Sequence, residues 1–339
     1  ATARVVMPEG PLSYIDVTRL QGSIEQDLKR RDFTVDALAV PLGSAEVIDV
    51  TGGLADLRAG TVRMTSAAVL AADPVRPLRG ARIAAELGFA VEADTASEIR
   101  RRAPDTAGAS PERCRDELAR IFALDEAATG VRLLDGLGLL DALLPELAAG
   151  RDCKQPAQFH VFDVYEHNVR TLEAMDAMLA PDRPEGGNGW MWDALWGAFE
   201  RWEAGLRRFL GEELTPGVPR GSLLKIAALL HDVGKPETRS VEADGRIRFL
   251  DHGDAGARRA ANIMRRLRFA TREIALVKLL VAEHLRPVQL APVGVVPTRR
   301  ALYRFHRDAG DALPLVLLLA LADGAAARGD QISKDDWSR

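Results

Sequence analysis

Three arginines recur at every third position in the segment AADPVRPLRGARIAAELGF, namely Arg76, Arg79 and Arg82. Asp73 can cap a helix and Pro74 suits the first helical position, so the segment predicts a helix that begins at Pro74. Because a step of three residues turns each side chain by about 60° on such a helix, the three arginines share an arc of about 120°. The arc is either a solvated basic face or a site for a polyanion, since guanidinium groups bind phosphate oxygens bidentately.

Histidines and aspartates with metal-binding chemistry occur in five short segments of the C-terminal half. These are His167 in YEHNV, His231 and Asp232 in LLHDVGKPETR, His252 in LDHGDAG, His284 in VAEHLRP and Asp323 in LALADGAAA. A single histidine on an apolar helix is usually structural. An adjacent His–Asp pair after an apolar helix is a different pattern, because imidazole and carboxylate together suit Mn, Fe, Ni, Co or Mg better than a closed structural zinc site.

The elements that would position these residues begin with a small head. Residues 1–66 contain the β-type runs RVVM, YIDVT, ALAVPL and EVIDVT, with a turn at Gly52–Gly53. Residues 67–150 have helical periodicity and form a neck. Within the neck, SPERCRDELARIFAL predicts a helix with Ser110 as its cap and Pro111 as its first residue.

The C-terminal region, residues 155–330, is expected to be helical throughout. It carries a Trp-rich insertion near 181–220, in which Trp192, Trp196 and Phe199 recur at helical spacing. Packing between helices is the favoured interpretation of this spacing, over a surface for a partner. The segment LPLVLLLALAD is too short for a membrane span and predicts a buried helix.

The composition indicates a chain with real hydrophobic cores. With 339 residues, of which 47% are hydrophobic, it should form two or more domains. We expect no membrane span, since no run of about 18 apolar residues occurs, and no signal peptide. Cys114 and Cys153 lie far apart without ligand spacing, which predicts reduced cysteines in a cytoplasmic protein. The net charge of −4 argues against a nucleic-acid coat over the whole chain but leaves a local basic face open.

Three ordered motifs carry a family resemblance. They are DLKRRDFTVDALAV, EVIDVTGGLADLRAG and ADPVRPLRGARIAAELGF. Together they resemble the class II tRNA nucleotidyltransferase and bacterial poly(A) polymerase family, whose pattern is RRDFT-x-NA, then ID-x-x-x-G-x-x-D, then EDP-x-R-x-LR-x-x-R. The resemblance covers about residues 1–145. It implies an Mg²⁺-dependent enzyme that transfers CMP or AMP from CTP or ATP to the 3′-hydroxyl of tRNA or another RNA.

The resemblance assigns roles to five residues of this chain. Arg31 would contact the incoming nucleotide. Asp73 and Arg76 would read the base edge, because a carboxylate accepts from the exocyclic amino group of C or A while a guanidinium donates to the neighbouring ring nitrogen. Arg79 and Arg82 would hold the triphosphate.

The chain also departs from the family pattern. The Gly-rich turn and the Asp-x-Asp pair that hold the two metals in this family are not in these 339 residues, which begin without a Met where the next strand would begin. We expect the true start to lie upstream. Asp16 matches the third carboxylate of that metal site. Ala72 replaces the usual Glu and Asp36 the usual Asn, and the loop between IDVTR and SIEQDLKRRD is unusually short.

The histidine segments resemble the HD metal-dependent phosphohydrolase superfamily, whose pattern is H…HD…D. Its positions are filled in order by His167, His231, Asp232 and Asp323. His252 and His284 match the extra histidines of dinuclear members, which implies a second ion. Lys235 either pairs with a substrate phosphate or stabilises its loop. The metal would be Mg²⁺ or a divalent transition metal.

The expected fold class is therefore α+β. It comprises a partial nucleotidyltransferase head, a mostly α-helical neck and body, and an all-α HD domain. The leading functional hypothesis is a CCA-adding or A-adding tRNA nucleotidyltransferase with an HD phosphohydrolase domain. Two alternatives stay open, namely an HD phosphohydrolase with an inactive head and a non-enzymatic scaffold that binds RNA or nucleotide. CCA addition, A addition, poly(A) synthesis, the HD substrate and the oligomeric state are likewise open.

Overall fold

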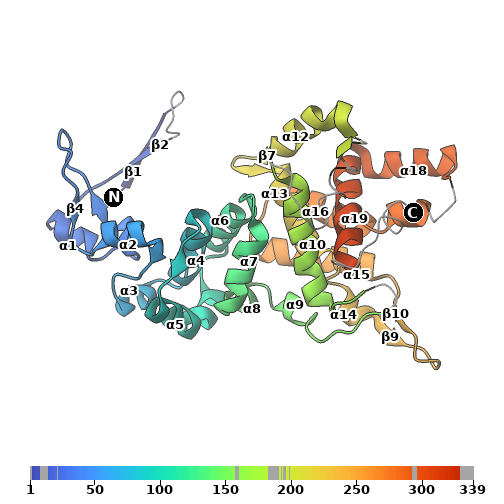
Figure 1. Ribbon diagram of the computed structural model, residues 1–339, viewed down its shortest axis with the longest axis horizontal. Coiled ribbons are helices and arrows are strands. Elements are labelled where there is room, and N and C mark those ends of the chain that lie inside the picture. Colours follow the sequence, from blue (N-terminus) through green and yellow to red (C-terminus); the bar gives the residue numbers. More distant parts are fainter. Residues whose placement is uncertain are drawn as a thin grey trace. The chain divides into compact units, whose positions relative to one another are not determined.

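The computed structural model divides the chain into two compact units, Ala1–Arg102 and Ala103–Arg339 (Figure 1). The structure describes residues 2–7, 14–20, 22–156, 160–181, 191, 193, 196, 197, 199–291 and 296–328. The first unit is a mixture of short strands and helices, and the second is mostly helical. The α+β fold class predicted from the sequence is confirmed.

The first unit contains three two-stranded sheets among its described residues. Its elements are β1 (Thr2–Val6), β2 (Tyr14–Thr18), α1 (Ile24–Leu28), β3 (Leu38–Ala39), β4 (Ile48–Asp49), α2 (Gly53–Ala59), β5 (Thr61–Val62), α3 (Ala67–Ala72), α4 (Arg76–Leu87), β6 (Ala90–Val91) and α5 (Ala93–Arg102). A short 3₁₀ turn, Thr34–Asp36, precedes β3. The β1–β2 and β3–β4 pairs are antiparallel, whereas β5 and β6 are parallel.

Two helices occur where only strands and turns were expected. The helix α1 begins with a capping box, in which Ser23 accepts from the Gln26 backbone and the Gln26 side chain accepts from the Ser23 backbone. The helix α2 begins after Asp49, whose carboxylate accepts the backbone N–H groups of four successive residues, Thr51 to Leu54. Both caps satisfy amides that would otherwise lack partners in a first helical turn. Each of these helices is too short for its apolar residues to show a helical period, so the sequence pattern did not predict them.

The helix α4 begins two residues later than predicted. Asp73 has an extended backbone, and its carboxylate accepts the Val75 N–H at 3.2 Å, so it caps a turn before the helix. Pro77 then lies in the first helical turn. The predicted start of the helix at Pro74 is therefore wrong, because a tight turn precedes the first helical residue, Arg76.

The second unit begins with four neck helices. They are α6 (Pro111–Phe122), α7 (Ala127–Gly136), α8 (Leu139–Leu143) and α9 (Pro145–Ala148), preceded by a 3₁₀ segment, Ala103–Gly108. The predicted cap of α6 is confirmed, because Ser110 Oγ accepts the Arg113 N–H at 3.4 Å and Pro111 is the first helical residue.

The remaining described helices of the second unit include α10 and α19, against which several of the others pack. They are α10 (Val164–Leu179), α12 (Glu203–Gly211), α13 (Arg220–Leu230), α14 (Lys235–Thr238), α15 (His252–Arg266), α16 (Thr271–Glu283), α17 (Arg286–Leu290), α18 (Arg299–Ala309) and α19 (Leu313–Arg328), with 3₁₀ turns at Glu200–Trp202 and Gly310–Ala312. Two hairpins interrupt them, β7 (Glu213–Thr215) with β8 (Val218–Pro219) and β9 (Arg239–Val241) with β10 (Ile247–Phe249). The region expected to be all-α thus carries small β-elements.

The helix α19 forms the centre of this region. It packs against α10, α13 and α16 (Figure 1). The stretch Arg299–Ala327 contains an 18-residue window that is apolar and long enough to cross a membrane by length and composition, but 56% of this window is buried inside the fold. This burial is what a core helix of a globular domain requires, in agreement with the buried helix predicted for LPLVLLLALAD.

Part of the predicted Trp-rich insertion lies outside the described residues, including Trp190 and Trp192. Trp196 is fully buried, and its indole N–H donates to the Met178 carbonyl at 3.0 Å. Trp202 is half exposed. Trp196 therefore packs against the end of α10, as the helical spacing predicts.

The predicted domain limits at 66, 150 and 155 stay predictions. By contacts, residues 103–150 of the neck belong to the same unit as the C-terminal helices. Several ion pairs within this unit join them, such as Arg132 of α7 with Glu166 of α10 at 2.8 Å. A second junction is buried, where Lys225 of α13 contacts Asp176 of α10 at 2.8 Å and donates to the Leu124 carbonyl at 2.5 Å.

Candidate functional site

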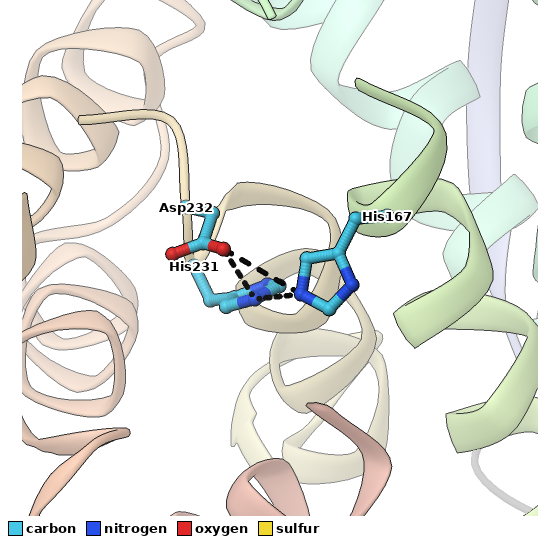
Figure 2. Close-up of side chains that lie close together, drawn as sticks. All are labelled: His167, His231 and Asp232. Carbon is cyan, nitrogen blue, oxygen red and sulfur yellow. Dashed lines mark hydrogen bonds and ion pairs between the residues drawn. The ribbon is translucent and has the colours of Figure 1, made fainter. Parts of the chain in front are cut away.

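Two helices of the second unit bring His167, His231 and Asp232 together (Figure 2). The helix α10 is capped by Asp163, whose carboxylate accepts the Glu166 N–H at 2.8 Å, and His167 follows on the buried side of its first turns. His231 is the C-cap of α13, which is almost wholly buried. The chain turns immediately after this cap, so Asp232 points back toward the imidazole of His167.

Four side chains form the first ligand group, although they come from three helices and a turn. The Nε2 atoms of His167 and His231 lie 3.2 Å apart. Asp232 Oδ2 lies 3.5 Å from the first and 3.3 Å from the second. Asp323 Oδ1, from α19, lies 2.9 Å from His167 Nε2 and 3.6 Å from His231 Nε2. The four residues predicted as one metal site thus lie together.

A second group uses the other oxygen of the same aspartate. Asp232 Oδ1 lies 3.4 Å from His252 Nε2 and 3.7 Å from His284 Nε2. None of these three atoms has a hydrogen-bond partner in the described part of the chain, although all are buried. Buried polar atoms without partners are costly, and a cation between them would satisfy all three. The residues therefore fit a divalent metal, and Asp232 fits a ligand shared by two ions.

The backbone fixes the direction of three of the imidazoles. Nδ1 of His231, His252 and His284 lies 2.8, 2.7 and 2.7 Å from the carbonyl oxygen three residues earlier. A carbonyl can only accept, so each Nδ1 carries the proton and each Nε2 presents its lone pair to the cluster when the ring is neutral. Metal-binding histidines typically donate the N–H of their other ring nitrogen to a carbonyl or carboxylate in this way.

The electrostatics of the cluster are strongly perturbed. Burial lowers the pKa of His284 to about 4 and also lowers the pKa of His167. Burial opposes the charge on His231 as well, but the carboxylates of Asp232 and Asp323 outweigh it and raise the His231 pKa to about 10. The pKa of each aspartate is held well below its usual value, against burial, by the charges of Lys235 and His231 at Asp232 and by hydrogen bonds from His167 and His231 at Asp323. The cluster therefore keeps both carboxylates ionised, and a cation bound there would displace the proton that they stabilise on His231.

Lys235 lies within this cluster. Its Nζ is 2.5 Å from Asp232 Oδ2 and 2.6 Å from the Oε1 of Gln155, and the side chain is buried. Of the two roles left open, these contacts favour support of the Asp232 loop. The sequence did not single out Gln155, because a glutamine 80 residues away from Lys235 carries no motif.

In the first unit, a buried carboxylate organises the arginines of α4. Asp32 Oδ2 lies 2.7 Å from Arg79 Nη1 and 3.9 Å from Arg76 Nε, and the Asp32 side chain is only 8% exposed. Arg76 also donates to the Val69 carbonyl at 2.9 Å. Both guanidinium groups stay partly exposed. Asp32 was not predicted as a site residue, although it belongs to the RRDFT motif.

The three sequence motifs interlock around this carboxylate. Thr34 Oγ1 donates to the buried Asp56 at 2.7 Å, which joins the first motif to the second. A Cβ on Gly53 would lie 2.1 Å from the Thr34 carbonyl oxygen, so only glycine permits this approach. Phe33 is fully buried, and a Cβ on Gly80 would lie 2.5 Å from its ring, which joins the first motif to the third. Many residues of the family pattern thus have a structural role, because they position Asp32 and the arginines of α4.

The other predicted nucleotide-binding residues differ in their surroundings. Arg82 is buried and bound to Glu86 at 2.6 Å. Burial and Asp32 raise the pKa of Asp36, and the charge of Arg82 opposes this rise. Arg31 is exposed and lies 3.5 Å from Asp27.

Asp16 lies on β2, opposite Arg4 of β1. Its two oxygens both accept from the Arg4 guanidinium at 2.7 Å, and the pair is exposed. The carboxylate of Asp16, which was predicted as a metal ligand, is therefore paired with Arg4.

Comparison with known proteins agrees with the three motifs. Residues 1–63 match the family model described as the poly(A) polymerase head domain, residues 88–150 match the probable RNA- and SrmB-binding site of polymerase A, and residues 206–328 match the HD domain. The A-adding tRNA nucleotidyltransferase of Deinococcus radiodurans is 36% identical over 325 residues, which cover 94% of this chain and 64% of that protein. The chain belongs to the tRNA nucleotidyltransferase and poly(A) polymerase family.

Other family members match this chain over a similar share of their own length. The CC-adding tRNA nucleotidyltransferase of Thermus thermophilus is 33% identical over 95% of this chain and 64% of its own length. Among solved structures, the Thermotoga maritima CCA-adding enzyme complexed with tRNA superposes with a TM-score of 0.58 at 17% identity, over 99% of this chain and 63% of that one. The chain thus spans about 64% of the length of these curated family members.

Proposed function

We propose that this chain acts on the 3′ end of tRNA, as a nucleotidyltransferase that transfers AMP or CMP from ATP or CTP to the terminal hydroxyl. The observation that carries the proposal is the pair of partly exposed arginines, Arg76 and Arg79, braced by the buried Asp32 at the start of α4. A guanidinium held in one orientation before the ligand arrives loses less entropy on binding. The relatives described as A-adding and CC-adding support the same proposal.

In this proposal Asp73 and Arg76 read the base. Asp73 lies in the turn just before Arg76, and the backbone N–H of Arg76 donates to the Asp73 carbonyl at 3.0 Å. The two side chains would bind the amino group and ring nitrogen that C and A share, so G and U are disfavoured.

Arg79 and Arg31 would bind phosphate oxygens. Arg82 is assigned a packing role, because burial and its bond to Glu86 leave it less available than the sequence suggested.

The predicted metal site of the head is incomplete among the described residues. Asp16 is the single predicted ligand of that metal in this sequence, and both of its oxygens are bound by Arg4. The described residues of the head therefore do not by themselves make up a metal site.

The test of base reading is a titration with the four nucleoside triphosphates. The chain should bind ATP and CTP more tightly than GTP and UTP, and Arg76→Ala should cost about 1–3 kcal/mol of that discrimination. Arg58→Ala is the matched control, because Arg58 is an exposed arginine of the same unit. Equal affinity of the wild type for all four nucleotides would contradict the assignment.

We also propose a metal-dependent phosphohydrolase activity for the HD domain, because its cluster leaves three buried ligand atoms without partners. His167, His231, Asp232 and Asp323 would hold one divalent ion, while Asp232, His252 and His284 would hold another. A bound divalent cation supplies Lewis-acid activation of a phosphoryl group. Lys235, which Gln155 holds in place, keeps Asp232 ionised and oriented, and the substrate class is a phosphate ester such as a cyclic phosphate or a nucleotide.

Metal analysis after dialysis, with phosphodiesterase activity followed in parallel, tests this second activity. A wild-type chain that retains neither metal nor activity would make the domain a structural relic of the HD fold. A cytoplasmic location belongs to the same proposal, and the two free cysteines, Cys114 and Cys153, support it.

A further inference from the structure

The helix α18 has one buried side and one basic side. Its sequence is RRALYRFHRDA, and Thr298 caps it by accepting the Ala301 N–H at 3.2 Å. Phe305 and Ala309 are buried, and the helix packs against α17 and α19. In Figure 1, α18 extends away from α19 at the right of the view. The apolar side of α18 is therefore already used for packing within its own unit.

The opposite side collects four arginines around a tyrosine. We call this surface the α18 face; it consists of Arg299, Arg300, Tyr303, Arg304 and Arg307. At about 100° per residue, these five side chains lie within an arc of about 140°. All five are exposed, and the Tyr303 side chain is 67% exposed. Arg307 pairs with Asp308 at 2.6 Å, whereas Arg299, Arg300 and Arg304 have no ion pair with any described residue.

Such a face has the chemistry of a nucleic-acid contact. Unpaired guanidinium groups attract phosphates, and an exposed aromatic ring offers a surface on which an unpaired base can stack. The chain as a whole carries a net charge of −4, so this concentration of positive charge is a local feature. A membrane surface fits less well, because a helix that binds in the interface needs a free apolar side and that of α18 is buried.

An ion pair connects the helix α18 to the segment that follows His284. Arg286 Nη2 binds Asp308 at the end of α18 at 2.9 Å, and its guanidinium lies 5.2 Å from the centre of the Phe305 ring. Arg286 also binds Glu283 at 2.8 Å and follows His284 by two residues. The basic helix is thus anchored to the segment that carries a predicted metal ligand.

We propose that the α18 face binds the phosphate backbone of RNA and that Tyr303 stacks on an unpaired base. This inference rests on the proposed function, which makes tRNA the substrate, but it assigns RNA binding to a part of the HD domain beyond the RNA-binding region matched at residues 88–150. Arg299 and Arg307 are about 12 Å apart along the helix, which is enough to contact two or more successive phosphates.

The experiment measures binding of a tRNA transcript that lacks its 3′ CCA, over a series of salt concentrations. Arg300→Gln/Arg304→Gln should weaken binding on the order of tenfold at low salt and reduce the slope of log affinity against log salt by between one and two. Tyr303→Ala should weaken binding about fivefold or more without a change in slope. The matched control is Arg246→Gln/Arg258→Gln, which removes two exposed arginines elsewhere in the same unit.

The outcomes separate this inference from the proposed function. If the wild type binds the transcript and the α18 variants bind it equally well, the inference is overturned while the proposed function stands. If the wild type does not bind the transcript, both fail. A parallel arm uses vesicles that contain anionic phosphatidylglycerol. Loss of vesicle binding in the α18 variants with unchanged RNA binding would overturn the inference in favour of a membrane contact.

Discussion

Replacing Asp32 by asparagine removes the charge that holds Arg76 and Arg79 while keeping the shape of the side chain. The bond between Asp32 Oδ2 and Arg79 Nη1 is short, at 2.7 Å, and Asp32 is nearly inaccessible. A hydrogen bond between charged groups contributes about 1.5–3 kcal/mol. Because the Arg79 side chain is 29% exposed and water can replace part of the contact, we expect a local loss near the lower limit, about 1.5–2 kcal/mol.

Amide hydrogen exchange of α4 is the appropriate assay for this loss, because tryptophan fluorescence reports only on the second unit. Exchange in α4 should accelerate by a factor of about 10 to 30, and the affinity for ATP and CTP should fall together. The Asp36 pKa, which is raised by burial and by Asp32, should fall in the same variant. Asp94→Asn, at an exposed position of the same unit, is the control. Unchanged exchange and unchanged nucleotide affinity in Asp32→Asn would refute the role given to this carboxylate.

Three further predictions concern the packing, the buried ion pair and the metal cluster. Gly80→Ala should destabilise the first unit by about 1–3 kcal/mol, measured by α4 hydrogen exchange, because the new Cβ would lie 2.5 Å from the Phe33 ring. Burial raises the pKa of Asp176 to about 6 despite Lys225, so the folded state binds this proton more tightly than the unfolded state. The free energy of unfolding of wild type relative to Asp176→Asn should therefore fall by up to about 3 kcal/mol as the pH rises from 4 to 6, and a flat difference in urea titrations would contradict this. Asp232→Ala should release all bound metal after dialysis, since both ligand groups use this carboxylate, and elemental analysis that finds metal at the wild-type level would contradict the shared-ligand assignment.

The family could be predicted from the sequence because its motifs are contiguous and ordered. Much of their content is local, such as the turn at Asp73 and the cap at Asp49. What could not be predicted is the contact between Asp32 and Arg79, which are 47 residues apart and meet only through the packing of Phe33 on Gly80. The burial of Arg82 was missed for the same reason.

For the HD cluster, the set of residues could be predicted from the sequence, whereas their orientations could not. The order of the histidines and aspartates along the chain predicted which residues form the cluster. The structure brings these residues together, although their role as ligands stays a prediction. The directions of the His231 and His284 imidazoles depend on a backbone carbonyl three residues earlier, which is a property of the helix end and not of residue type. The Lys235–Gln155 contact depends on a loop before α10 that has no periodic pattern.

The most direct test of the central claim is incorporation of labelled nucleotides into tRNA transcripts that end before CCA, after CC, or after CCA. The assay should use both the chain described here and the full-length product of its gene, in Mg²⁺, with Arg76→Ala as the matched variant. We expect the full-length product to add CMP or AMP to at least one truncated transcript, to add nothing to the complete one, and to lose base selectivity with Arg76→Ala. Failure of the full-length product to extend any transcript, or unchanged selectivity in Arg76→Ala, would contradict that claim.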